Sequence, residues 1–277
     1  TFPYCFSFIG FLGLEVFTCL TSITIPDSVT SIGGGAFADC TSLTSIIIPD
    51  TVTSIGAGAF LHCTSLTSIT IPDNVTNIGG GAFSGCSALT RIEVAAGNVN
   101  YTEVNGVLFH TEMTLLHTYP AAKTGANYVI PDSVTSIGVH AFEGCPNLTS
   151  ITIPDGVTSI GEWAFRGCTS LTDITIPDGV TSIEYAAFAD CSSLTSITIP
   201  DGITSIGENA FDKCEGLTSI TIPDSVTSIG IDAFSYCKSL PSITIPDSVT
   251  SIGYKALEYC KNHNTNTHHT LQTKREV

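Results

Sequence analysis

Cysteines recur at one position of a repeating pattern in this 277-residue chain, where they could form disulfides, bind a metal or remain free thiols. The position follows a Phe or Leu by three residues and points into the expected core, where a thiol behaves as a small hydrophobic group. Neighbouring copies would lie about 4.8 Å apart, whereas the Cβ atoms of a disulfide prefer about 3.8 Å, and no Cys-x₂-Cys zinc spacing occurs. We therefore expect a ladder of buried free thiols, with cross-links as the alternative. Its members are Cys40, Cys63, Cys86, Cys145, Cys168, Cys191, Cys214, Cys237 and Cys260, and only Cys5 and Cys19 lie outside it.

Aspartates form a second regular set, within the recurring tripeptide Ile-Pro-Asp. Pro and Asp together favour a turn, because Pro presets φ and Asp can bond nearby backbone N–H groups. Carboxylates stacked one turn apart could also bind Ca²⁺ weakly, since Ca²⁺ takes several oxygen ligands. No EF-hand-like loop occurs, so turn chemistry is the favoured interpretation and weak Ca²⁺ binding along this Asp ladder is the alternative. The ladder comprises Asp27, Asp50, Asp73, Asp132, Asp155, Asp178, Asp201, Asp224 and Asp247.

Hydroxyl residues form a third set, an outward-facing Ser and Thr pair on each expected strand. A regular hydroxyl array suits a regular partner such as a glycan, a mineral or ice. The favoured interpretation, however, is that Ser and Thr simply tolerate strands and water. Asp173 departs from the pattern once, and Arg91 with Glu93 replaces both members, whereas the return side varies much more, as at Glu162-Trp163 and Tyr254-Lys255. The candidate binding face is Ser150, Thr152, Thr175, Ser196, Thr198, Ser219, Thr221, Ser242 and Thr244.

Catalytic and cofactor chemistry lacks a recognisable motif. The seven histidines are scattered, no Ser has a recognisable His and Asp arrangement, and no phosphate-binding or dinucleotide fingerprint occurs. We predict no catalytic residue, no cofactor and no dedicated metal site, and hence no enzyme.

Composition excludes several classes of protein. The formal charge is −16, which argues against nucleic acid and anionic membrane surfaces, since both attract clustered Lys and Arg. Charged residues make up 12% and hydrophobic ones 43%, so the chain can build a large core and is not disordered. Glu15 interrupts the most apolar stretch, so no membrane span is expected.

The positioning element is a 23-residue repeat, present in ten copies of which one is expanded. In a typical copy, alternation sends Ile46 and Ile48 inward, and Pro49 ends the strand because it lacks an N–H. Gly56 permits a bend, and Phe60 lies in a short helical or 3₁₀ return. Stacked copies cover one another's apolar sides, which predicts a solenoid. The expected aromatic spine is Phe37, Phe60, Phe83, Phe142, Phe165, Phe188, Phe211 and Phe234.

The domain organisation follows from where the repeat is regular. Residues 1–262 are expected to form one solenoid, with a degenerate cap at 1–19, and residues 263–277 read as a polar tail. The expanded copy at 98–127 predicts a β-hairpin, with strands over 101–109 and 114–119 and turn chemistry at Asn105-Gly106. The hairpin is interpreted as structural, with a dedicated binding loop as the alternative.

The unit Leu-x-x-Ile-x-Ile-Pro-x-x-Val-x-x-Ile-Gly-x-x-Ala-Phe-x-x-Cys, over roughly residues 12–262, closely resembles the BspA-like leucine-rich-repeat family. The resemblance implies an α/β-type, right-handed solenoid with a parallel β-sheet on one face and short helical or 3₁₀ returns on the other. It also implies adhesion or contact with a protein or surface glycan, in an extracellular or cell-surface setting, and it carries over no catalytic residue. A structural scaffold or lattice-binding protein that uses the Ser/Thr face is the alternative.

Overall fold

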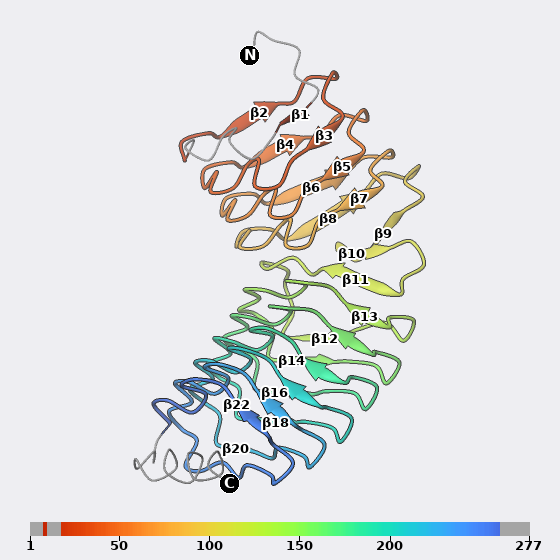
Figure 1. Ribbon diagram of the computed structural model, residues 1–277. Coiled ribbons are helices and arrows are strands. Elements are labelled where there is room, and N and C mark those ends of the chain that lie inside the picture. Colours follow the sequence, from red (N-terminus) through yellow and green to blue (C-terminus); the bar gives the residue numbers. More distant parts are fainter. Residues whose placement is uncertain (1–7, 10–17, 261–277) are drawn as a thin grey trace.

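The computed structural model describes residues 8–9 and 18–260, and Figure 1 shows their turns stacked into one curved column. The predicted cap at 1–19 lies mostly outside the described residues, and the predicted tail at 263–277 lies wholly outside them. The described part contains 22 short strands and no helix. Because the repeats differ little, each turn places equivalent residues above one another, and the fold is an extended β-solenoid of the leucine-rich-repeat type.

The first row of parallel strands is the predicted one. Partners are 23 residues apart, as in Ile174 with Ile197, and the strands alternate between exposed and buried side chains. Ile47 is 80% exposed, whereas its neighbours Ile46 and Ile48 are buried, as period-2 alternation requires. The row comprises β2 (Ser22–Thr24), β4 (Ser45–Ile47), β6 (Ser68–Ile71), β8 (Arg91–Val94), β12 (Asn127–Val129), β14 (Ser150–Thr152), β16 (Asp173–Thr175), β18 (Ser196–Thr198) and β20 (Ser219–Ile220).

A second row of parallel strands follows the Pro-Asp turn, which the sequence did not predict as a strand. In the turn, the Val52 amide donates to the Pro49 carbonyl at 3.0 Å, and the chain then extends for two residues at a time. The row comprises β1 (Phe8–Ile9), β3 (Ser31–Ile32), β5 (Ser54–Ile55), β7 (Asn77–Ile78), β11 (Leu115–Thr118), β13 (Ser136–Ile137), β15 (Ser159–Ile160), β17 (Ser182–Ile183), β19 (Ser205–Ile206), β21 (Ser228–Ile229) and β22 (Ser251–Ile252).

The predicted helical or 3₁₀ returns are absent from the described residues, so that part of the prediction is wrong. Each return contains two residues with positive φ, such as Gly58 at 61° and His62 at 57°. A left-handed residue every fourth position interrupts a right-handed helix. Amides along the return therefore alternate between partners: Leu61 donates to Gly58 within its turn, and Phe60 donates to Ala82 in the next.

The core is an aromatic and aliphatic stack inside the column, divided at the expanded repeat into two clusters. All eight spine phenylalanines are buried, and adjacent rings stack with centroids 5.1–5.7 Å apart and planes within 13° of each other. Tyr119, from the expanded repeat, continues the stack against Phe142 at 5.2 Å. The predicted spine is confirmed, and each ring covers the next from Phe37 to Phe83 and again from Phe142 to Phe234.

The expanded repeat forms an antiparallel meander, not a detached excursion. Strand β9 (Tyr101–Val104) pairs with β10 (Val107–His110), which pairs with β11, and β11 then joins β13 in parallel. In Figure 1 these strands lie at mid-height of the column, between the regular repeats up to β8, which we call the first block, and those from β12 onward, which we call the second block. The insertion therefore begins the second strand row of the later repeats through β11 and β13, and among the described strands none of its members pairs with β7.

Side chains complete the hydrogen bonds where the second row is interrupted at Ile78. Strand β7 is an edge of its sheet, so the N–H and C=O of Ile78 have no strand beside them. The Ile78 amide donates to Tyr101 Oη at 2.8 Å, and His117 Nε2 lies 3.1 Å from the Ile78 carbonyl oxygen. Burial lowers the pKa of His117, which favours the neutral ring with Nε2 as donor. These two side chains replace the missing backbone partner.

Candidate binding surfaces

The predicted Ser/Thr face is an exposed, registered array over β14 to β20. Ser150 is half-buried and the other eight predicted residues are exposed. Thr175 lies opposite Thr198, and Asp173 lies between Ser150 and Ser196 in the same register. Residues 242–244 are not in a strand, so the last predicted pair lies beyond the end of this sheet.

The hydroxyls of this face differ from those of the threonines that precede each strand. Thr172 Oγ1 donates to the Thr149 carbonyl at 3.1 Å, and Thr195 Oγ1 donates to the Thr172 carbonyl at 3.0 Å, so these threonines join successive turns. We call this series the threonine rail. On the face, no side-chain hydrogen bond to any described residue engages Thr175, Ser196, Thr198, Ser219, Thr221, Ser242 or Thr244. Their hydroxyls are available to water or a ligand.

The cysteine ladder is buried and unbridged between Cys40 and Cys237, as predicted, and Cys260 is half-buried. Each thiol has a specific partner: Cys191 Sγ donates to the Phe165 carbonyl at 3.1 Å, and Cys214 Sγ donates to the Phe188 carbonyl at 3.1 Å. Burial raises the pKa of Cys40, chiefly by desolvation, to about 11. Burial also raises the pKa of Cys191 and Cys214, so these thiols are protonated hydrogen-bond donors between turns, with little thiolate character.

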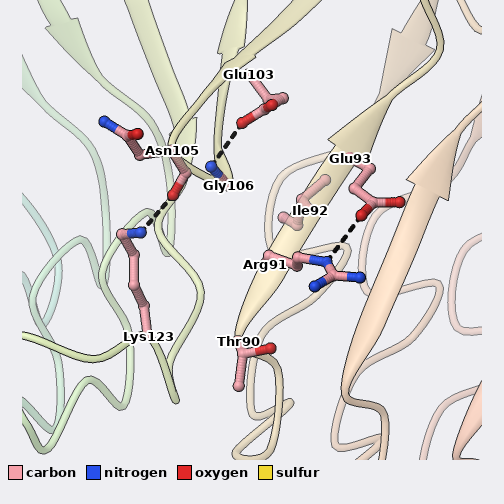
Figure 2. A pocket seen from close by; sticks show the side chains of 8 residues that line it. All are labelled: Thr90, Arg91, Ile92, Glu93, Glu103, Asn105, Gly106 and Lys123. Atoms are coloured by element: carbon pink, nitrogen blue, oxygen red, sulfur yellow. Dashed lines mark hydrogen bonds and ion pairs between the residues drawn. The ribbon is translucent and has the colours of Figure 1, made fainter.

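A polar hollow of about 350 Å³ lies where the insertion meets β8 (Figure 2). Three segments build it: β8, the turn between β9 and β10, and the chain after β11. Gly106 permits the close approach, because its φ is 80° and an added Cβ would lie 2.8 Å from Arg91 Cβ. The lining residues are Thr90, Arg91, Ile92, Glu93, Glu103, Asn105, Gly106 and Lys123.

The charged side chains around the hollow are bonded within the chain, either to each other or to the backbone. Arg91 Nε contacts Glu93 Oε1 at 2.8 Å, the Gly106 amide donates to Glu103 Oε2 at 2.5 Å, and Lys123 Nζ donates to the Asn105 carbonyl. Figure 2 shows these three contacts around the hollow. The arrangement could bind a small polar group by hydrogen bonds, but it presents no nucleophile beside a general base.

A network of polar side chains joins the two blocks on the return side. Glu143 receives hydrogen bonds from Ser84 and from His140 Nδ1, the latter at 2.5 Å, and Arg166 lies 3.1 Å away. Burial opposes ionisation of Glu143, but these partners together hold its pKa below the usual value. Because Ser84 bonds to the carboxylate and not to the imidazole, the network does not activate a nucleophile. It fastens one block to the other.

The Asp ladder lies on an exposed edge, with every member solvent-exposed. Within residues 8–9 and 18–260, no group of three or more His, Cys, Asp or Glu side chains is placed to hold a metal ion. The same residues contain no helix that is long and apolar enough to cross a membrane.

Sequence reasoning identified the parts of the hollow without assembling them. Arg91 and Glu93 stood out as departures from the Ser/Thr pattern, and Asn105-Gly106 stood out as a turn. Lys123 carried no local signal, and only the fold brings it to the other side of the hollow. The sequence contained one clue to the hollow: the break in the Ser/Thr pattern and the expansion occur in the same repeat.

A family model described as a BspA type leucine rich repeat region matches residues 15–119, 122–220 and 204–276. None of the curated proteins is significantly similar to the chain. Among solved structures, a leucine rich cell surface protein from Faecalibacterium prausnitzii A2-165 is 38% identical, with a TM-score of 0.75. That match covers 90% of this chain and 65% of the other, so the chain spans about two thirds of that protein's length.

Two further structures are similar over most of the chain. A leucine-rich repeat protein from Eubacterium ventriosum ATCC 27560 is 28% identical, with a TM-score of 0.65, over 90% of this chain and 85% of the other. The pneumococcal vaccine antigen PcpA is 23% identical, with a TM-score of 0.68, over 88% of this chain and 67% of the other. The second likeness bears on the fold alone.

Proposed function

This chain belongs to the BspA-type leucine-rich repeat family, and on that premise we propose that it is a non-enzymatic binding protein that acts outside the cell or at its surface. Its partner is a protein or a surface glycan. The observation that carries the proposal is the 38% identity, over 90% of the chain, to a protein described as a leucine rich cell surface protein. A continuous stack of nearly identical turns also suits binding, because it presents long, rigid surfaces to a partner.

The Ser/Thr face is the surface predicted to make the contact. Ser150 donates to Asn127 Oδ1 at 2.8 Å, but the exposed hydroxyls from Thr175 onward have no side-chain hydrogen bond to a described residue, whereas those of the threonine rail are bonded to the preceding turn. A hydroxyl that is already exposed and unbonded loses less on binding than one that must leave an internal hydrogen bond. The face is therefore free to serve a ligand while the rail holds the fold.

Surface display is tested by antibody labelling of cells that make the protein, before and after permeabilisation. We expect intact cells to be labelled. In a second experiment, beads coated with folded protein should attach to cells or matrix more than beads coated with denatured protein. Labelling only after permeabilisation, together with equal attachment of both kinds of bead, would contradict the proposal.

The contact face is tested by two matched triple variants. Thr175→Val/Thr198→Val/Thr221→Val removes three exposed hydroxyls from the face, and we expect weaker attachment with an unchanged melting temperature. Thr172→Val/Thr195→Val/Thr218→Val removes three rail hydrogen bonds, each worth about 0.5–1.5 kcal/mol, so it should lower the melting temperature and leave attachment by the folded protein intact. The reverse pattern would exclude the Ser/Thr face.

A second candidate function is a scaffold that binds a regular lattice, such as a crystalline glycan, a mineral or ice. The observation that favours it is the strict register of the face, where Thr175 lies directly opposite Thr198 and Ser196 opposite Ser219. Adsorption to crystalline polysaccharide or mineral, and inhibition of ice recrystallisation, should then be lost in the face variant. Equal adsorption by both triple variants would exclude this function.

A further inference from the structure

Two basic side chains that are far apart in the sequence flank the polar hollow. No Lys or Arg other than Arg91 and Lys123 precedes Arg166 in the chain, and these two lie on opposite sides of the hollow (Figure 2). Arg91 and Glu93 stand where the other strands of this row carry the Ser and Thr pair, and Arg91 lies opposite Ser68 of β6. The sequence therefore departs from its repeat at the place where the fold leaves a space.

Lys123 carries a charge that no acidic group of the described structure balances. Every other Lys and Arg within residues 18–260 pairs with an Asp or Glu at 2.6–3.5 Å, whereas Lys123 Nζ donates to the Asn105 carbonyl. Its backbone is held on both sides, because its N–H donates to the Pro120 carbonyl at 3.0 Å and its carbonyl accepts from Asn147 Nδ2 at 3.5 Å. A half-buried charge without a counter-charge is costly, so this lysine suits an anionic group from outside the chain.

The opposite wall of the hollow holds a guanidinium and a carboxylate side by side. Arg91 Nε contacts Glu93 Oε1 at 2.8 Å, and Glu93 Oε2 accepts a hydrogen bond from Thr70 at 3.3 Å, so the pair is held in place. The two Nη atoms of Arg91 make no hydrogen bond to any described residue, and the side chain is 61% exposed. A guanidinium donates and a carboxylate accepts, so the pair suits neighbouring hydroxyls, which can do both.

Size and charge select the ligand. A hollow of about 350 Å³ is at the small end of ordinary ligand pockets, which span about 300–1,000 Å³, so a single sugar unit is the size that fits. Ile92 is the one aliphatic lining residue and its side chain is buried in the core of the first block, so the hollow offers no apolar pocket for a peptide side chain. Glu93 and Glu103 also line it and would repel a doubly charged anion such as sulfate.

We propose that the hollow is a binding site for an acidic sugar, that is, a hydroxylated ring with one carboxylate, as in a uronic acid. The carboxylate lies against Lys123 Nζ, and two neighbouring hydroxyls lie against Arg91 and Glu93. This inference goes beyond the proposed binding function, because it assigns a site outside the Ser/Thr face. It rests on that function only in naming a surface glycan as the source of the sugar.

Binding is tested by following the backbone amide NMR signals of the whole protein during titration with sodium D-glucuronate. The amides of Ile92 and Gly106 should shift in a saturable manner, because they border the hollow and Ile92 donates to the Gly106 carbonyl at 2.9 Å. D-glucose lacks the carboxylate and acetate lacks the hydroxyls, so each should bind about tenfold more weakly or worse, the factor that a hydrogen bond to a charged group commonly supplies.

Methyl β-D-glucuronide distinguishes the sources of the sugar. Its anomeric hydroxyl is blocked, as it is in a glycan, and we expect it to bind as tightly as the free acid. Binding of the free acid alone would overturn a glycan as the source.

Two variants alter the two walls separately. Lys123→Gln removes the unbalanced charge, so it should weaken glucuronate about tenfold or more and leave glucose unchanged. Arg91→Ser/Glu93→Thr restores the regular pair of the repeat, so it should fold, and it should weaken glucuronate to a similar extent without a change in net charge. Lys238→Gln is the matched control, because Lys238 pairs with Glu215 at 2.6 Å in the second block, and it should leave binding unchanged.

Three outcomes would overturn the inference: sulfate that binds as tightly as glucuronate, which would mark a general anion site; glucuronate binding that survives in both variants; or no saturable shift at Ile92 and Gly106 in the parent. The melting temperature of each variant separates loss of the site from loss of the fold, and the double variant keeps the test valid if Lys123→Gln does not fold. The labelling and bead experiments above do not depend on the hollow, so failure here is distinguishable from failure of the proposed function.

Discussion

At the scale of single residues, the cysteine ladder shows how a thiol can serve as a structural hydrogen-bond donor. Most carbonyls of the Phe spine accept the amide of the cysteine in their own turn, as Phe165 does from Cys168, and the thiol of the cysteine one turn later, as Phe165 does from Cys191. The ladder thereby satisfies two donors with one carbonyl and ties adjacent turns together.

The ladder predicts instability in alkali. Desolvation raises the pKa of Cys40 and Cys260 to about 11, so the folded state retains protons that the unfolded state releases near its ordinary pKa. This stabilisation is complete below about pH 8.5, and it is lost as the pH rises through the pKa that the thiols have in the folded state. Melting temperatures measured from pH 8 to pH 11 should fall, and the fall should be shallower in Cys191→Ala/Cys214→Ala. Tyr254→Phe, which removes an exposed hydroxyl outside the ladder, should keep the parent's slope.

Thiol counting gives an independent check of the ladder. Denaturation without reductant should expose most of the eleven thiols of the chain to a thiol reagent, and the folded protein at pH 8 should react slowly. Widespread loss of free thiol would indicate cross-links and remove the basis of the pH prediction.

At the scale of elements, alternation and repetition made the strands predictable, and the returns were misjudged. Ile46 and Ile48 could be placed inward because a strand has a strict period of two. Ala59-Phe60 resembles the start of a helix, and the information against one lies in the φ values of Gly58 and His62. Glycine at residue 58 hints at a left-handed turn, but histidine at residue 62 gives no such signal.

The left-handed positions can be tested by opposite substitutions at the same place in two turns. Gly58→Ala should lower the free energy of unfolding by about 1–2 kcal/mol, because Ala is strained at φ 61° while its Cβ would meet only ordinary contacts with Leu61. Ala186→Gly, at φ 50°, should be neutral or stabilising, since relief of strain opposes the greater entropy of glycine in the unfolded chain. Chemical denaturation measures both, and equal destabilisation would show that packing, and not φ, controls these positions.

The insertion is the element whose position the sequence did not reveal. A hairpin could be predicted from Asn105-Gly106, but not that Tyr101 and His117 would supply the hydrogen bonds of a missing strand at Ile78. No local pattern relates residues 39 positions apart in an interrupted repeat. The same limit applies to the hollow, which needs Lys123 beside a strand that ends at Val94.

His117 predicts a loss of stability in mild acid. Burial holds its pKa below the ordinary value near 6.5, so as the pH falls through about 6.5 the unfolded state takes up a proton that the folded state does not. The stability that His117 contributes above about pH 6.5 should then decline as the pH falls toward the lower pKa that His117 has in the folded state. His117→Gln keeps an N–H donor for the Ile78 carbonyl but cannot charge, so its melting temperature should depend less on pH between 7 and 5. His110→Gln, at an exposed position, should retain most of the parent's decline.

At the scale of the whole molecule, the column contains two apolar cores that meet at the insertion. Residues from Ile25 to Ile92 form one, and those from Ile130 to Ala256 form the other. Strand β10 contributes to both, because alternation sends Leu108 into the first core and Val107 with Phe109 into the second. The insertion is thus a joint that closes the end of each regular stack, which accounts for its place within the column independently of any ligand.

The two-core arrangement predicts that damage to one block stays in that block. Phe188 is buried and stacks on Phe165 at 5.2 Å and on Phe211 at 5.5 Å, so Phe188→Ala should cost about 3–5 kcal/mol locally. Repeats couple mainly to their neighbours, so amide hydrogen exchange should rise most in the turns around residues 165–211 and stay near the parent's rates over residues 25–92. Phe60→Ala, the matched change in the first block, should show the mirror-image pattern. If amide hydrogen exchange rose by a similar amount from Leu20 to Cys260 in either variant, the insertion would transmit the whole loss of stability and the column would unfold as one unit.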